Sequence, residues 1–178
     1  KPKWKQTVSE GGNSALLFDD NTVVLFHETR PKPFAIINTF IDVNNIIISS
    51  EHFGAISNDT VQIYSIQNQQ CQPLTEIPVE SQSIALFEDT LYIAQNQNLL
   101  LTDLEGSVKL KVRLNQDEGD SFVLGSNAEV LVQLTDNNIL KVMKIGQKEP
   151  FILHTLSIND SISSHLVSNI LSLKISID

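Results

Sequence analysis

Four histidines have the broadest chemical repertoire in this sequence, because imidazole can bind a metal ion or transfer a proton near neutral pH. They are His27, His52, His154 and His165. Metal sites are usually built from ligands in short clustered motifs, together with cysteine or carboxylate partners. These histidines are far apart and fall in different repeats of the pattern described below. We therefore expect them at strand ends or on the surface rather than in a metal centre.

Carboxylates and a single thiol offer other chemistry. Asp-Glu-Gly-Asp at 117–120 gathers carboxylates, but it lacks the alternating ligand spacing of a calcium loop, so a solvated connection is expected. The Asx residues at 19–20 and 136–138 suit turns, because their side chains satisfy nearby backbone groups. Cys71 follows a glutamine run and has no cationic neighbour to activate it, which predicts an inert thiol.

Motifs for catalysis or nucleotide binding do not occur in the sequence. There is no phosphate-binding glycine loop, no Gly-x-Ser-x-Gly elbow and no kinase signature. Serines are abundant, but none is accompanied by a plausible base. We therefore expect no catalytic residue, no metal and no cofactor, and the sequence gives no positive reason to assign an enzyme.

Composition limits the classes of partner. The chain of 178 residues has a net charge of −9, which argues against a nucleic-acid surface because phosphate binding rests on clustered Lys and Arg. A single cysteine excludes an internal disulfide and favours a reducing compartment such as the cytoplasm. No apolar run approaches the roughly 20 residues needed to span a bilayer.

The elements that would position any site follow from a repeat. Short apolar runs flank polar turns at positions 20, 58, 96 and 137, which gives steps of 38, 38 and 41 residues. Asx turns between β-branched or aromatic runs predict hairpins, here at Asp20-Asn21, Asn58-Asp59, Asn96-Gln97 and Asn137-Asn138. A period of roughly 40 residues made only of strands is typical of a β-propeller blade. No segment shows capped 3.6-residue periodicity, so helix should be scarce.

The predicted fold is all-β, a partial propeller with about four to four and a half four-stranded blades visible. Residues 1–12 are predicted as a linker, with Trp4 anchoring it against the first blade, and residues 13–178 as propeller. The blades are expected at 13–42, 43–80, 81–116, 117–160 and 161–178. Closed propellers usually have four to eight blades, so we expect a piece of a larger propeller rather than a closed four-bladed ring.

Strand alternation predicts which side chains are buried. The core should include Ile47, Ile63, Leu86, Leu100, Val123 and Val132. The cations of the alternating segment 108–114, at 109, 111 and 113, should face solvent or a partner and so discourage edge-to-edge pairing. The runs NIIIS, SIALF and SFVLG are expected innermost and carry almost no ionisable residues, which disfavours a catalytic site in the central channel.

The repeats lack the Gly-His and Trp-Asp dipeptides of regular WD40 blades, so the propeller is WD40-like but degenerate. The order and spacing of several runs nevertheless resemble the second N-terminal β-propeller of the intraflagellar transport protein 140 family. The resemblance is carried by SNDTVQIYSI at 57–66, by Glu88-Asp89 before Leu91-Tyr92, by Gly106-x-Val108, and by the Glu118-Gly119 loop followed by an FVL-type strand. Lys3-Trp4 before a polar linker also fits the junction between that family's two propellers.

The resemblance implies a non-catalytic scaffold in a complex A subunit, acting in retrograde ciliary transport and in the entry of membrane proteins into cilia. Implied partners are other complex A subunits, with complex B and cargo adaptors as further candidates, and membrane association would be peripheral, through the complex. The implied location is the cytoplasm, the cilium or flagellum and the ciliary base. The family has no catalytic motif to carry over to this chain.

Two alternatives remain open at this stage. A propeller of another vesicle-coat or tethering complex would share the architecture but not the partners. A propeller enzyme would need His, Asp, Glu or Arg converging on the innermost strands. An open run of blades would also leave sheet faces uncovered, so the segment alone is expected to be poorly soluble and to need its full chain or its partners.

Overall fold

The computed structural model of the chain describes residues 1–39, 42–80, 83–95 and 98–114, and beyond them the strands within 121–157. The described part consists of strands, turns and loops, and none of its segments is a helix of the length and apolar character needed to cross a membrane. The predicted all-β class is therefore confirmed.

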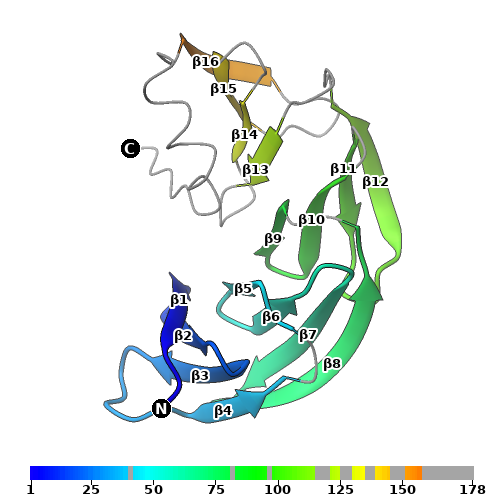
Figure 1. Ribbon diagram of the computed structural model, residues 1–178. Helices are drawn as coiled ribbons and strands as arrows, with labels where there is room; N and C mark the ends of the chain where they lie inside the picture. The colour runs from blue at the N-terminus through cyan, green and yellow to red at the C-terminus, as the bar shows by residue number, and fades with distance from the viewer. Residues whose placement is uncertain are drawn as a thin grey trace.

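Four antiparallel sheets of four strands each follow one another along the chain (Figure 1), in the orders β1-β2-β3-β4, β5-β6-β7-β8, β9-β10-β11-β12 and β13-β14-β15-β16. The first contains β1 (Trp4–Glu10), β2 (Asn13–Phe18), β3 (Thr22–His27) and β4 (Ala35–Asn38). The second contains β5 (Asn45–Ile48), β6 (His52–Ile56), β7 (Thr60–Gln67) and β8 (Gln70–Pro78). The third contains β9 (Ser83–Phe87), β10 (Thr90–Gln95), β11 (Asn98–Thr102) and β12 (Val108–Arg113). The fourth contains β13 (Ser121–Leu124), β14 (Val130–Leu134), β15 (Ile139–Lys144) and β16 (Phe151–Ser157).

Successive sheets are arranged as propeller blades. The first strands of neighbouring sheets contact one another, β1 with β5, β5 with β9 and β9 with β13, whereas β4, β8 and β12 run along the outer rim of the arc in Figure 1. Up-and-down strand order within each sheet makes every connection a local hairpin. This is the predicted blade architecture.

The segment predicted as a linker, residues 1–12, contains β1, which pairs with β2 over the register Glu10↔Asn13 to Trp4↔Phe18. The sequence did not predict this strand, because β1 carries few apolar side chains. Its polar groups instead bond to the neighbouring sheet: Gln6 Oε1 accepts from the backbone N–H of Ile46 over 3.1 Å. Trp4 belongs to this strand and is 65% exposed, so it is not a buried anchor; its indole N–H donates to Thr7 Oγ1.

Two of the four predicted turns lie in the described part, and both are at the predicted positions. Between β2 and β3, Asn21 has a φ of 63°, and Asp20 Oδ1 accepts from the N–H of Thr22 over 3.1 Å. Between β6 and β7, Ser57 Oγ donates to Asp59 Oδ1 over 2.9 Å. In the first turn an Asx side chain therefore accepts from the backbone, whereas in the second Ser57 Oγ accepts from the backbone N–H of Thr60 over 3.1 Å. The predicted turns at Asn96-Gln97 and Asn137-Asn138 lie outside the described residues.

Apolar side chains fill the spaces between sheets. One buried cluster joins the first two sheets and includes Leu17, Leu25 and Phe53. A second joins the second and third sheets and contains Ile63 and Leu86, each 1% exposed, which confirms two predicted core residues. A third lies within and beside the third sheet, around Leu99 and Val112.

Other burial predictions were partly wrong. Ile47 and Leu100 are only partly buried and pack against the margin of the second cluster, because Ile46 and Ile48 point the opposite way along β5, into the first cluster. The side chains of Val123 and Val132 lie outside the described part. The cations of β12, Lys109, Lys111 and Arg113, are exposed as predicted. Val108 on the same strand is also exposed, at 55%.

Candidate functional site

The histidines occupy separate places, as far as the structure describes them. His27 Nδ1 lies 2.8 Å from Thr29 Oγ1 in an exposed turn. His52 is buried at the start of β6, with Nδ1 3.6 Å from Asp89 Oδ1 of the third sheet. The side chain of His154 and the whole of His165 and residues 117–120 lie outside the described part. Among the residues that are described, no group of three or more His, Cys, Asp or Glu could hold a metal ion.

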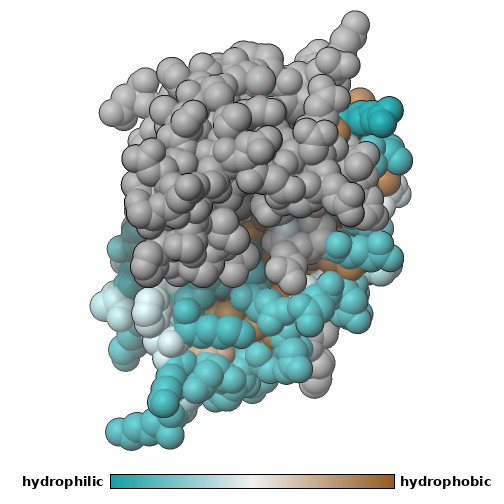
Figure 2. Space-filling model, turned by 45° about the horizontal axis from the view of Figure 1, so that its top comes forward, coloured by the Kyte–Doolittle hydropathy of each residue, from teal (hydrophilic) through white to brown (hydrophobic). Residues whose placement is uncertain are grey.

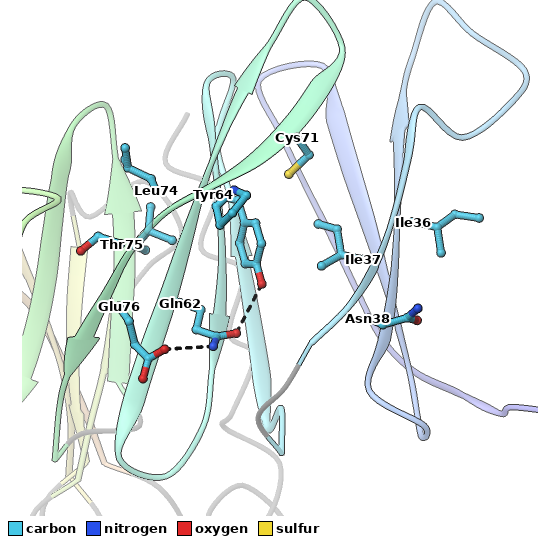
Figure 3. Close-up of a pocket in the computed structure, with 11 residues that line it drawn as sticks. Ile36, Ile37, Asn38, Gln62, Tyr64, Cys71, Leu74, Thr75 and Glu76 are labelled. Atoms are coloured by element: carbon cyan, nitrogen blue, oxygen red, sulfur yellow. Dashed lines mark hydrogen bonds between the residues drawn. The ribbon is translucent and has the colours of Figure 1, made fainter.

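A groove of about 510 Å³ lies between the outer strands of the first two sheets. Its lining includes Ile36, Ile37 and Asn38 of β4, Tyr64 of β7, and Cys71 and Leu74 of β8. Figure 3 shows Ile37 turned toward Cys71 and Tyr64, with Ile36 on the opposite side of β4. β4 has four residues and β8 has nine, so β8 is the longer of the two walls.

Two large apolar side chains are exposed at the margins of this groove. Ile36 is 65% exposed and Leu74 is 48% exposed, and Figure 3 shows each on the side of its strand that faces away from the other strand. Leu74 occupies the bulge of β8, where the register with β7 shifts between Ile63 and Tyr64. A bulge twists the strand and re-aims side chains. Figure 2, by comparison, shows a face whose described residues are mainly hydrophilic, with small hydrophobic areas between them.

One end of the groove is polar. Tyr64 Oη donates to Gln62 Oε1 over 3.3 Å, and Gln62 Nε2 donates to Glu76 Oε2 over 3.1 Å; both bonds are drawn in Figure 3. These two hydrogen bonds orient the Glu76 carboxylate at the rim of the groove. Burial, together with the charges of Cys71 and Glu76, raises the pKa of the Tyr64 phenol, so Tyr64 remains a donor at neutral pH.

Cys71 lies at the other end, and among the described residues no cation perturbs its pKa. Burial raises the pKa of its thiol from 9.0 to about 11. Because the thiolate is the nucleophile, a neutral thiol at physiological pH is unreactive. In this groove Cys71 therefore contributes apolar packing against the first cluster.

The outer edge of β4 presents backbone groups. Thr39 N–H donates to the carbonyl of Asn21, which continues the β3–β4 register in which Val23 faces Ile37. Antiparallel ladders alternate paired and outward-facing positions. The backbone groups of Ile36 and Asn38 therefore point away from β3, toward the rim of the groove.

The described residues of the groove offer exposed apolar surface together with hydrogen-bonding groups of the backbone and of side chains. β1 is the innermost strand of the first sheet, although its sequence was not among those expected to be innermost, and it carries the cation Lys5. Lys5 Nζ donates to the carbonyl of Val43, which precedes β5 of the next sheet. The polar side chains of β1 therefore join blades.

Comparison with known proteins identifies the fold's family. The model of the family described as IFT140 second beta-propeller matches residues 16–177. The chain belongs to the IFT140 second β-propeller family. The match covers nearly the whole of the four sheets, and it confirms the resemblance that the sequence suggested.

Solved structures show the same fold as this IFT140-family propeller at low identity. Kluyveromyces lactis Hsv2 is 10% identical with a TM-score of 0.59, covering 85% of this chain and 50% of that one. KlHsv2 with loop 6CD replaced by a Gly-Ser linker is 10% identical with a TM-score of 0.60, covering 84% and 50%. The chain thus spans about half the length of these propellers. No curated protein matches it.

The groove was not predicted from the sequence. Its walls come from β4 and β8, which are far apart along the chain and meet only because adjacent blades pack. One local signal was present: Leu74 sits among the polar residues of Gln72 to Glu76, where an outer strand gains nothing from an exposed leucine unless a partner covers it.

Proposed function

We propose that this chain is a non-catalytic interaction scaffold of an intraflagellar transport complex A subunit, acting in retrograde ciliary transport and in ciliary entry of membrane proteins. The observation that carries the proposal is the family match over residues 16–177. Its partners are other complex A subunits, with complex B and cargo adaptors as further contacts. It works in the cytoplasm, the ciliary base and the cilium, and reaches membranes through the complex.

The physical features of the described residues agree with such a role. A rigid stack of sheets presents rim strands and loops at fixed spacing, and affinity in such interfaces comes from a few well-placed anchors rather than from total area. Ile36 and Leu74 on the rim are anchors of the appropriate type.

The test is isolation of the tagged full-length protein from ciliated cells, with ciliary localisation as a second readout. Ile63→Asp, which places a charge in the core, should abolish recovery of other complex A subunits, whereas the exposed control Lys32→Gln should retain it. Recovery of vesicle-coat or tethering subunits alone would overturn the proposal in favour of a different propeller scaffold.

A further inference from the structure

We propose that the rim groove between β4 and β8 binds an extended peptide segment, which adds as a fifth strand to the edge of β4 and places a Lys or Arg beside Glu76. This extends the scaffold role proposed above by naming a class of partner, and it rests on that role only in treating the chain as an interaction module.

The outer edge of β4 offers backbone groups to an added strand. Thr39 N–H bonds toward β3, to the carbonyl of Asn21, and two residues earlier in the same register Ile37 faces Val23. Counted back from Thr39, the alternation directs the N–H and C=O of Ile36 and Asn38 outward. A strand added here would satisfy these groups by the same ladder that joins β3 to β4, which is the mode of many peptide-binding sheets.

Apolar side chains lie on both faces of the position that the added strand would take. On the groove side a ligand residue would contact Ile37 and Tyr64, and on the other side the next residue would cover Ile36. Ile36 is 65% exposed, so it has area to bury. Since alternate side chains of a strand point to opposite faces, the ligand should carry β-branched or other apolar residues at neighbouring positions.

The negative charge of Glu76 favours a cationic ligand residue at this end of the groove. Glu76 is exposed and is held by Gln62, which leaves its second oxygen directed at no described cation; neither of the two ion pairs found among the described residues includes it. The chain's net charge of −9 adds to the preference for a cation. An anionic or strongly acidic peptide is disfavoured at this end, which sets the ligand's charge.

The probe is a synthetic peptide, acetyl-Lys-Val-Thr-Val-Thr-amide, with its reversed sequence to cover both strand directions. Binding to the full chain is measured by fluorescence anisotropy of a labelled copy. Occupancy is measured at alkaline pH, where part of the Cys71 thiol is ionised and reacts, by slowed alkylation of Cys71 read by peptide mapping. Two peptide controls replace Lys with Glu or carry N-methylated valines. Both should bind several-fold more weakly, because the first lacks the cation and the second lacks the backbone donors.

The sharpest protein variant is Asn38→Pro. Proline lacks an N–H but fits an edge strand when that N–H faces outward, so the variant should keep its fold and bind the peptide about twofold to tenfold more weakly, as expected for one lost hydrogen bond. Asn38→Ala, which keeps the N–H, is the matched control and should bind as the wild type does. Glu76→Gln should weaken the Lys peptide by a similar factor and leave the Glu peptide no weaker.

Three results would overturn the proposal: equal binding of the N-methylated peptide, unchanged affinity in Asn38→Pro with its thermal melt intact, or binding that leaves the modification rate of Cys71 unchanged. If Asn38→Pro does not fold, the Glu76→Gln and N-methyl comparisons decide. Peptide binding is measured on the purified chain and does not depend on complex A subunits. Failure of peptide binding is therefore distinguishable from failure of complex A subunits to co-purify.

Discussion

The side-chain amide of Asn13 donates a hydrogen bond to the carbonyl oxygen of Ser49 over 3.0 Å, which joins the first sheet to the second. The same nitrogen donates to the carbonyl of Ser50 over 2.9 Å. Asn13 is 3% exposed. Removal of its amide would therefore leave both carbonyl oxygens without this hydrogen-bond donor in a largely buried position. The residue is the first of β2, beside the turn that joins β1 to β2.

Replacing Asn13 by alanine should lower the free energy of unfolding by about 1–3 kcal/mol, because two largely buried hydrogen bonds are lost. Equilibrium denaturant unfolding measures the change. Asn44→Ala is the control, since its amide bonds within the second sheet to Asn58 Oδ1 in an exposed position, and it should cost about 0.5 kcal/mol or less. Equal losses in the two variants would show that Asn13 does not hold the blades together.

Ile63→Ala should cost roughly 2–5 kcal/mol, because Ile63 is 1% exposed within the cluster between the second and third sheets and its truncation leaves a cavity. Ile36→Ala is the matched comparison, the same change at a side chain that is 65% exposed, and should stay within about 0.5 kcal/mol of wild type. A loss below about 1 kcal/mol for Ile63→Ala in denaturant melts would contradict its core placement.

The repeated hairpins were predictable because each is encoded locally. An Asx turn such as Asn58-Asp59 and the alternation of Val61 and Ile63 lie within a few residues of each other, so the sheet register follows from the sequence alone. The family resemblance rested on the same runs. Burial of Ile63 and Leu86 followed from alternation with no knowledge of neighbouring blades.

Features that depend on distant segments were not predictable. β1 is polar and is held by its pairing with β2 and by bonds such as that of Gln6 to Ile46, so nothing in the sequence WKQTVSE marks it as a strand. The groove likewise requires β4 and β8 to be neighbours. Exposure of Ile36 follows from where β4 ends the first sheet, which its own apolar sequence does not reveal.

Gly54 should not tolerate a side chain. A Cβ there would lie 2.7 Å from Ile47 Cγ1 and 3.3 Å from Ile63 Cδ1, and overpacking of this kind costs about 1–3 kcal/mol. Gly54→Ala should therefore destabilise the chain, and Ile47→Ala in the same molecule should recover part of the loss. The double-mutant cycle measures this, with a coupling of at least about 0.5 kcal/mol expected. Strict additivity would mean that Ile47 yields without strain.

Lys109 should control the ionisation of Asp103. Lys109 Nζ lies 2.7 Å from Asp103 Oδ2, and its hydrogen bond is the main reason that the pKa of the Asp103 carboxyl is lowered. In Lys109→Met the pKa of Asp103 should rise toward its ordinary value, measured by NMR titration of the carboxyl carbon. Lys111→Met is the control and should leave it unchanged. The bond of Asp103 Oδ1 to Ser107 N–H persists in both variants and keeps part of the shift.

Cys71 gives the chain a pH dependence in the alkaline range. Burial raises the pKa of its thiol from 9.0 to about 11, so between these values the unfolded chain releases a proton that the folded chain retains. The unfolded state then binds fewer protons, and stability must fall as pH rises through this window. Chemical denaturation from pH 8 to 11 should show a shallower decline in Cys71→Ala than in wild type, because Tyr64 titrates in both. The alkylation rate of Cys71 should meanwhile climb until about pH 11, since only the thiolate reacts. A rate that levels off near pH 9 would show that the thiol is not buried in the groove.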